Sequence, residues 1–148
     1  MEIVNILLLS ALPISELRGG IPLAIYYGLN PLTSYILCVA ANIAPVPLIL
    51  IILEKFDWIF KKIPIINSIY SYVIKIAEKR KKAIEKYGYL GLTIFVAIPA
   101  PVTGAWTASL IAFLMRLNKL KAFFYISAGV FIAGLIVTSA TLGIFSIF

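Results

Sequence analysis

Apolar residues fill four long blocks of the chain, and more polar segments separate them. The blocks cover residues 3–28, 32–53, 88–115 and 120–148. A helix needs roughly 20 apolar residues to cross the hydrocarbon core of a membrane, and each block is at least that long. The second and fourth blocks predict helices that span a membrane.

Helix-breaking residues interrupt the first and third blocks near their middle. Proline removes a backbone donor and clashes with the preceding turn, and glycine adds flexibility. Each half of the first block has about 10–13 residues, which as a helix cover roughly half of the bilayer. The predicted breaks are Pro13, Gly19, Gly20 and Pro22 in the first block and Pro99, Pro101 and Gly104 in the third.

Two topologies fit such blocks: discontinuous helices that cross the membrane, or re-entrant hairpins that enter and leave on one side. Residues 54–87 hold nine basic and four acidic residues, a net charge of +5, and residues 116–121 add +3. Four crossings would put these two segments on opposite faces. Two hairpins and two spans put both on one face, as the positive-inside rule prefers, so charge favours hairpins.

We therefore expect an all-α integral membrane protein with one domain over residues 1–148. It is expected to be a multi-pass protein of the plasma membrane, with 54–87 and 116–121 in the cytoplasm. Its expected parts are a re-entrant hairpin over 3–28, a spanning helix over 32–53, a connector over 54–87, a second re-entrant hairpin over 88–115 and a second spanning helix over 120–146.

Similar short strings in the two halves predict an inverted repeat. Ala11-Leu12-Pro13 opens the first break and Ala97-Ile98-Pro99 opens the second, while Leu29-Asn30 and Leu117-Asn118 follow the two hairpins. Coincidence among short apolar strings is the alternative. In an inverted repeat the hairpin tips meet near the midplane of the membrane, where transport sites usually lie.

The connector over residues 54–87 is predicted to form an amphipathic helix in the membrane interface. Trp58 and Phe60 stand close to lysines, which is typical of an aromatic face beside a basic face among the headgroups. The basic run at 79–82 is most simply a determinant of topology that also contacts anionic lipids.

Composition supports a membrane protein and excludes several functional classes. Of the 148 residues 62% are apolar and 13% are charged, whereas a soluble domain is about 45–50% apolar and about 25% charged. Mean hydropathy is +1.05. The chain has no histidine, which excludes imidazole catalysis and histidine-ligated metals, and its single Cys38 cannot form an intrachain disulfide.

Motifs for nucleotide binding or covalent catalysis are missing from the sequence. There is no P-loop, dinucleotide-binding motif, zinc-ligand spacing or nucleophile triad, so we expect neither an enzyme nor a cofactor or metal. The net charge of +7 lies mostly beside membrane segments. The expected partners are therefore membrane lipids and an anionic lipid or small-molecule substrate, and not nucleic acid.

Two charged residues lie at the tip of the first broken block. Glu16 and Arg18 stand between apolar flanks, and a charge at bilayer depth costs about 2.5–3.5 kcal/mol on insertion scales. Such residues are functional candidates, although a surface loop over 13–20 would also tolerate them. In a loop they can pair with each other or meet partners from the second hairpin. Glu16 is the only carboxylate of this region, which makes it the predicted proton carrier.

The second break offers hydroxyls and backbone amides. A helix that begins near Thr103 directs its N-terminal amides and the positive end of its dipole towards the membrane centre. With Arg18 these groups suit a phosphate or a carboxylate. Arg116 is either a snorkelling residue or part of an entrance for an anionic headgroup. The predicted substrate-binding residues are Ser15, Arg18, Gly19, Gly20, Thr103, Gly104, Trp106, Thr107 and Arg116.

Polar and small residues inside the predicted spans offer further contacts. Asn42, next to the prolines at 45 and 47, either lines the same cavity or packs between helices. Two spans and two hairpins form a thin protein that barely shields its hairpin loops, so we expect a homodimer or larger assembly. A contact face between copies is predicted from small residues of the last span: Ala128, Gly129, Ala133 and Gly134.

Two strings together resemble the small multidrug export protein family. They are Glu16-Leu17-Arg18-Gly19 with Ile21-Pro22, and Pro99-x-Pro101-x-Thr103-Gly104-x-Trp106-Thr107. That family is similar to the DedA, or VTT-domain, superfamily. The resemblance implies inverted re-entrant hairpins and movement of lipids such as polyprenyl phosphates, with proton coupling. It implies that Glu16 is the acidic residue of the hairpin and that Arg18 binds phosphate, while the arginine usual in the second hairpin motif is missing here.

Three functions are compatible with these features. The first is a secondary transporter or flippase for an anionic lipid such as a polyprenyl phosphate, coupled to protons through Glu16. The second is a proton-coupled exporter of cationic lipophilic drugs, although Arg18 beside the carboxylate would repel a cation. The third is a scaffold subunit that transports nothing, which mutual pairing of Glu16 and Arg18 without water access would favour.

Overall fold

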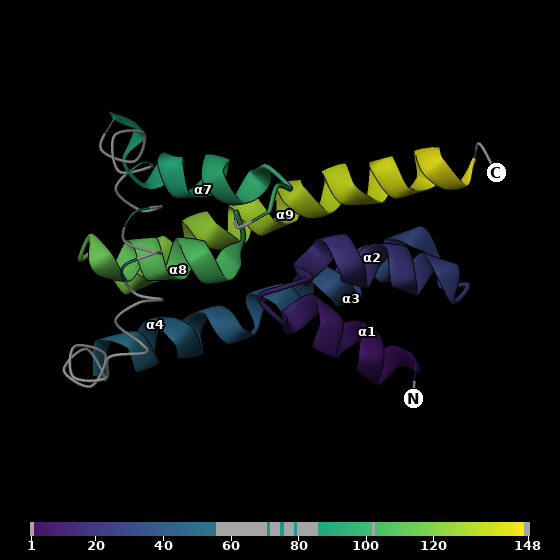
Figure 1. The fold of residues 1–148 in the computed structure, drawn as a ribbon, viewed down its shortest axis with the longest axis horizontal. Coiled ribbons are helices and arrows are strands. Elements are labelled where there is room, and N and C mark those ends of the chain that lie inside the picture. Colours follow the sequence, from purple (N-terminus) through teal and green to yellow (C-terminus); the bar gives the residue numbers. More distant parts are fainter. Residues whose placement is uncertain are drawn as a thin grey trace.

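The computed structural model describes residues 2–55, 71, 75, 79, 86–101 and 103–146. Within these residues the only regular secondary structure is α-helix. Two rods run along most of the molecule (Figure 1), namely α3 (Pro31–Ile43) continued by α4 (Pro45–Lys55), and α9 (Lys119–Phe145). The segments Pro31–Lys55 and Lys119–Ile144, of 25 and 26 residues, are long and apolar enough to cross a membrane. As helices they are about 37 and 39 Å long.

Local sequence explains where the two rods begin and bend. Asn30 and Asn118 are their N-caps, with side-chain oxygens that accept from the backbone N–H of Leu32 at 2.9 Å and of Lys121 at 3.1 Å, which satisfies donors in the first turn. The first rod is interrupted before Pro45, because proline has no N–H to continue the helical hydrogen bonds. The Leu-Asn strings after the two predicted hairpins are therefore helix starts.

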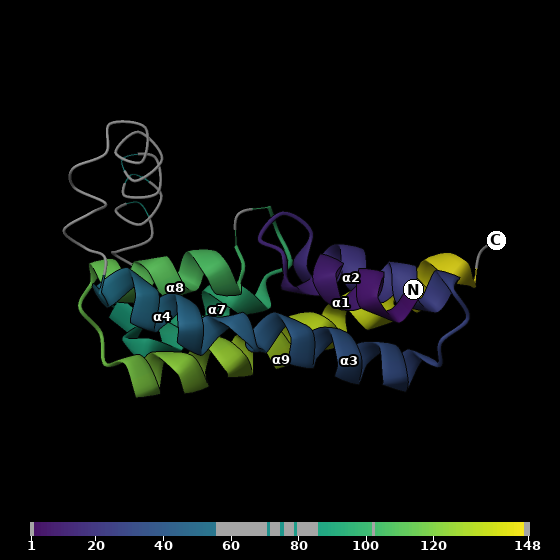
Figure 2. The ribbon, with the colours of Figure 1, turned by 90° about the horizontal axis from the view of Figure 1, so that it is seen from below.

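Four short helices form two antiparallel pairs, each beside one half of the rods (Figure 1). With 9 to 11 residues each, the helices are about 14–17 Å long, roughly half the thickness of a bilayer core. The connections within the two pairs reach the middle of the molecule and project from the same face (Figure 2). The pairs consist of α1 (Glu2–Ala11) with α2 (Glu16–Tyr26), and α7 (Tyr89–Ala97) with α8 (Ala105–Leu114).

Three of the predicted breaks lie inside a helix and not in a loop, which corrects the sequence-based prediction. Gly19, Gly20 and Pro22 belong to α2, so the first break is confined to residues 12–15. Pro22 removes only the hydrogen bond to the carbonyl four residues earlier. The glycines allow α2 to approach α1 closely, since a Cβ on Gly20 would lie 1.8 Å from Ser10 Oγ. The remaining predicted breaks lie between helices: Pro13, Pro99, Pro101 and Gly104.

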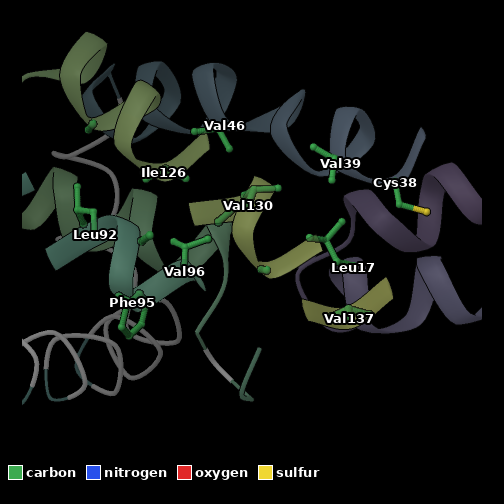
Figure 3. Packing of buried hydrophobic residues seen from close by; sticks show 14 of the residues in the cluster. Leu17, Cys38, Val39, Val46, Leu92, Phe95, Val96, Ile126, Val130 and Val137 are labelled. Carbon is green, nitrogen blue, oxygen red and sulfur yellow. The ribbon is translucent and has the colours of Figure 1, made fainter. Parts of the chain in front are cut away.

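Buried apolar side chains from the rods and the short helices pack together in the interior (Figure 3). Two glycines of α9 let neighbouring helices approach closely, since a Cβ on Gly129 would lie 2.6 Å from Val96 Cβ, and one on Gly134 would lie 2.8 Å from Val39 Cγ2. Gly129, Ala133 and Gly134 are thus buried within the chain. The predicted contact face between copies is wrong for these three residues, because all three are buried within the chain, with Gly129 against α7 and Gly134 against α3.

The described residues of the two basic segments on either side of the short pair α7–α8 include contacts at one end of the molecule. Lys119, at the start of α9, forms an ion pair with Glu54 in the last turn of α4. The backbone N–H of Asn118 donates to Tyr89 Oη at 3.1 Å, so α7 begins at this end as well. The end that carries residues 54, 55, 86, 116, 119 and 121 is therefore the basic end of the described structure.

The outer surface is apolar in a way that fits lipid and not water. Only 28% of the apolar window in Pro31–Lys55 and 39% of that in Lys119–Ile144 are buried, whereas a core helix of a soluble protein is mostly buried. Large apolar side chains face outwards along every rod, among them Leu48, Phe124 and Leu135. The chain is a helical membrane protein. Most of the predicted connector helix lies outside the described residues.

Candidate functional site

Glu16 begins α2 at the tip of the first helix pair and is buried, with 7% of its surface exposed. Its φ angle is +47°, a left-handed conformation that costs a non-glycine residue roughly 1–2 kcal/mol. The turn before it is held by the Ser15 hydroxyl, which donates to the Leu9 carbonyl at 2.5 Å, and by the Glu16 N–H, which donates to the Leu12 carbonyl at 3.1 Å. Strained residues of this kind cluster at functional sites.

The carboxylate of Glu16 lies against the second helix pair, at the N-terminus of α8. A Cβ on Gly104 would lie 1.8 Å from Glu16 Oε2 and 2.0 Å from Oε1, so only glycine leaves room for the carboxylate. The backbone N–H groups of Trp106 and Ala105, in the first turn of α8, form hydrogen-bond interactions with it. The partial positive charge at a helix N-terminus favours an anion here. A carboxylate from one helix pair thus caps a helix of the other.

Trp106 provides a second link between the two pairs. Its indole Nε1–H donates to the carbonyl of Ala11, the last residue of α1, at 2.8 Å. This bond satisfies one of the carbonyls that a helix C-terminus leaves free. The Trp106 side chain therefore has a clear role in holding the tips of the two helix pairs together.

Thr103 organises the connection between α7 and α8. Its hydroxyl lies within donor distance of the carbonyls of Ile98, at 2.5 Å, and of Ala100, at 2.7 Å, and it accepts from the Ala100 N–H at 3.1 Å. These local bonds fix the loop that carries Pro99 and precedes Gly104. The orientation of the α8 N-terminus, and hence the seat of the carboxylate, depends on this loop.

A small cavity lies where the two helix pairs meet the rods. Its polar lining comes from Glu16, Arg18, Asn42 and Thr103, and its volume of about 10 Å³ is roughly the room that one water molecule requires. Figure 3 shows several of the apolar lining side chains, from α2, α7 and α9. The remaining lining residues are Leu17, Val96, Pro99, Val130, Ala133 and Val137.

Arg18 shares this cavity with Glu16 without pairing to it. Its positive charge acts on the Glu16 carboxylate. Among the residues that the structure describes, however, Lys119 and Glu54 form an ion pair, whereas Glu16 and Arg18 do not. The guanidinium is thus near the carboxylate and remains available to another anion.

Sequence reasoning left the role of Asn42 open between lining a cavity and packing, and the structure gives it both. Its side-chain Nδ2 donates to the carbonyl of Ser10 at 2.8 Å, which ties α3 to α1, and the residue also lines the central cavity. In the sequence, Asn42 stands out as an amide side chain within an apolar span, just before the proline kink. This position predicts that the side chain makes a polar contact, but it does not predict that the partner is the Ser10 carbonyl.

Several predicted binding residues lie outside the central cavity. Ser15 and Thr107 are half-buried. Gly19 and Gly20 face α1, where a Cβ would meet Leu9 or Ser10. Arg116 lies beyond the C-terminus of α8, at the opposite end of that helix from Gly104. The structure therefore brings together Glu16, Arg18, Thr103, Gly104 and the backbone of Trp106, but not the other predicted residues.

A second and larger cavity, of about 450 Å³, lies at the basic end of the molecule. Arg116 is the only one of its residues that the sequence-based prediction included. The complete lining consists of Leu50, Glu54, Phe113, Arg116, Leu117, Asn118 and Lys119. No sequence signal brings α4 next to the junction of α8 and α9, so the other residues of this cavity were missed.

Comparison with known proteins identifies the family. Residues 16–136 match the family model described as "Putative small multi-drug export protein". Comparisons with curated proteins and with solved structures gave no match. The matched range covers most of the chain, from the buried Glu16 at the start of α2, through the pair α7–α8, into α9. The chain therefore belongs to the small multidrug export protein family.

Proposed function

We propose that the protein is a proton-coupled secondary transporter that moves an anionic amphiphile, such as a polyprenyl phosphate, across the membrane. The observation that carries this proposal is the position of the Glu16 carboxylate, at the N-terminus of α8 and in the same cavity as Arg18. Helix N-termini and arginine side chains are the groups that proteins use to bind phosphate. The carboxylate thus occupies a position at the N-terminus of α8 that would also favour the negative charge of the substrate.

Exchange between the carboxylate and the substrate supplies a mechanism. When a proton adds to a Glu16 carboxylate oxygen, the side chain becomes neutral and its attraction to the α8 amides and to Arg18 weakens. The phosphate of the substrate then takes this place, so a proton and an anion are bound together. Release of the substrate on the other side lets Glu16 lose its proton and return to the N-terminus of α8.

The proposed architecture is that of two re-entrant hairpins in an inverted repeat. Support comes from helix pairs that are half a bilayer long and from connections that reach the middle of the rods (Figure 2). The tips, held together by Gly104 against Glu16 and by Trp106 against Ala11, would then lie near the midplane, where transport sites are usual. By the positive-inside rule the basic end faces the cytoplasm of a plasma-membrane protein.

In the proposed mechanism, the conformation of the structure is closed to the substrate. A cavity of about 10 Å³ has no room for a phosphate group, so binding requires the two hairpin tips to separate. The contacts that would break are the packing of the Glu16 carboxylate against Gly104 and the hydrogen bond from Trp106 to Ala11. Both lie at the interface between hairpins, as alternating access by movement of one repeat against the other requires.

A proton-coupled exporter of lipophilic cations is the second candidate. The family description favours it, as does Glu16, the one buried carboxylate among the residues that the structure describes, because Glu16 would bind a proton and a cationic drug in turn. The positive end of α8 and the charge of Arg18 oppose it, since both repel a cation from this position. A scaffold without transport is less well supported, because Glu16 and Arg18 do not form an ion pair in the described structure.

Transport assays in liposomes distinguish these candidates. We would follow the movement of a labelled polyprenyl phosphate and of a fluorescent lipophilic cation, in wild type, Arg18→Ala and the control Lys121→Ala. Lys121 is a basic residue at the exposed end of α9, outside the central cavity. We expect movement of the phosphate, about tenfold slower in Arg18→Ala because a charge-assisted contact is lost, and unchanged in Lys121→Ala. Movement of the cation alone would instead establish the drug exporter.

A further inference from the structure

The cavity at the basic end lies apart from the central site and has no role in the proposed transport. Its lining residues come from the end of α4, the end of α8 and the start of α9. The rods are about 37–39 Å long, which exceeds a hydrocarbon core of about 30 Å. The end of the rods, and with it this cavity, therefore reaches the headgroup region of a membrane.

The lining combines positive charge with an apolar wall. Arg116 and Lys119 carry two positive charges, and Glu54 carries one negative charge that an ion pair with Lys119 already engages. The local net charge is therefore +1. The apolar wall consists of Leu50, Phe113 and Leu117. Such a lining fits a ligand with an anionic head and an apolar body, and a small inorganic anion would leave the wall without a partner.

Arg116 occupies an unusual backbone position in the turn between α8 and α9. Its φ angle is +52°, in the left-handed region that glycine and asparagine adopt more readily than other residues. The turn is closed by the Arg116 N–H, which donates to the Phe113 carbonyl at 3.0 Å, and by the Leu117 N–H, which donates to the Ala112 carbonyl at 2.9 Å. This turn holds the arginine beside the cavity.

We propose that the cavity at the basic end binds the phosphate headgroup of an anionic membrane lipid. Arg116 and Lys119 hold the phosphate, and Leu50, Phe113 and Leu117 contact the glycerol and the first part of the acyl chains. Glu54 pairs with Lys119 in the structure and competes with the lipid for it. The site is a resident-lipid site that anchors the basic end, and it does not depend on transport at the central cavity.

Lipid binding is measured on the full chain in neutral detergent micelles. A fluorescent phosphatidylglycerol is titrated with wild type, Arg116→Asn, Glu54→Gln and the control Lys121→Gln. Asparagine removes the charge but tolerates the left-handed backbone, and Lys121 lies outside the cavity lining, about 200° around α9 from Lys119. All titrations are repeated in the Arg18→Ala background, so that the central site does not contribute.

The expected results follow from the charges. Arg116→Asn weakens binding about fivefold, as for one basic residue near an anionic headgroup. Glu54→Gln strengthens it several-fold, and Lys121→Gln changes it by less than about twofold. Unlabelled phosphatidylglycerol competes, whereas phosphatidylcholine and inorganic phosphate do not.

Three results would overturn the proposal. They are an effect of Arg116→Asn no larger than that of Lys121→Gln, equal competition by phosphatidylcholine, and equal competition by inorganic phosphate. Circular dichroism and the elution volume check the fold of each variant. Should Arg116→Asn fail to fold, Glu54→Gln decides, since weaker or unchanged binding in that variant contradicts the proposed competition for Lys119.

Discussion

At the scale of single residues, the contact between Glu16 and Gly104 decides how the site works. Glycine is required there by space and not by backbone conformation, because the φ angle of Gly104 is −128° and its ψ angle is −174°, an extended conformation open to any residue. Any side chain at this position collides with the carboxylate. The carboxylate therefore reaches the N-terminus of α8 through two residues, Glu16 from the first helix pair and Gly104 from the second.

Gly104→Ala is expected to displace the carboxylate and to lower stability by about 1–3 kcal/mol, the usual cost of an overpacked contact. Glu16→Asp withdraws the carboxylate by one methylene, so the double variant should regain part of the loss. Thermal unfolding in detergent of the two single variants and the double variant gives the coupling between the two positions. Purely additive effects of the two substitutions would show that the residues are not in contact.

Sequence alone could identify the charged residues of this site but not their arrangement. Glu16 and Arg18 stand out because charge inside an apolar block is costly. Gly20, also predicted to bind substrate, packs on Ser10 instead. The sequence cannot distinguish a glycine that leaves room for a ligand from one that leaves room for a neighbouring helix, because the difference depends on which group packs against the glycine in the fold. Gly104 was predicted for its amides, and its role as the seat of a carboxylate requires the fold.

At the scale of helices, the N-terminus of α8 is where the two pairs are joined. The carboxylate of Glu16 and the carbonyl of Ala11 both meet this helix, through its backbone and through Trp106. The helical elements themselves follow from sequence: prolines separate the paired helices and asparagines cap the rods. Pro22 is the seventh of the eleven residues of α2 and does not end the helix. It removes one backbone hydrogen bond, and packing of α2 on α1 and α3 offsets that loss.

Trp106→Phe removes the hydrogen bond to Ala11 and keeps a ring in its place. We expect a loss of about 1 kcal/mol in stability, and the same loss in the control Tyr35→Phe, which removes a bond of 3.1 Å from α3 to the Phe131 carbonyl of α9. Only Trp106→Phe should make the tips separate more easily.

The readout is the rate at which a water-soluble thiol reagent modifies Val137→Cys, a buried residue of the cavity lining, in a Cys38→Ala background. An increase of about fivefold is expected for Trp106→Phe and no increase for Tyr35→Phe. Equal rates in both variants would argue against a role of Trp106 in closing the cavity.

At the scale of the whole molecule, the connections within the two helix pairs carry exposed apolar side chains near the middle of an apolar surface. Ile14, at the first tip, is 90% exposed and Ile98, at the second, is 50% exposed. Loop backbone in the hydrocarbon region must be covered by protein or must line a cavity. Both tips project from one face (Figure 2), so a second copy that packs on this face would cover them. The sequence predicted an assembly because two spans and two hairpins form a thin protein, but three of the four α9 residues proposed for its contact face are buried within the chain.

Crosslinking tests this assembly. In a Cys38→Ala background, Ile14→Cys is expected to form a disulfide between copies in native lipid, whereas Leu48→Cys, on the lipid-facing side of α4 with 60% exposure, is expected to stay monomeric. Monomer for both cysteines would contradict a dimer over the hairpin tips. Crosslinking through Leu48→Cys alone would place the contact on α4 instead.

The distribution of charge connects the overall architecture to transport. From the sequence, the two basic segments were expected on one side, and their described parts meet through Lys119 and Glu54. What no charge count predicts is that Glu16 reaches across to α8, since this contact joins residues nearly ninety positions apart. In the proposed mechanism this contact is the place where a proton on Glu16 and the anionic substrate are exchanged.

Proton movement measured together with lipid movement shows whether Glu16 couples the two. Vesicles that contain a pH-sensitive dye and the reconstituted protein receive a labelled polyprenyl phosphate, and both signals are followed in wild type, Glu16→Gln and the control Glu2→Gln. We predict that protons cross only when the lipid is present, that Glu16→Gln abolishes this proton flux, and that Glu2→Gln leaves it unchanged. Lipid movement without proton flux in wild type, or proton flux that persists in Glu16→Gln, would contradict the account.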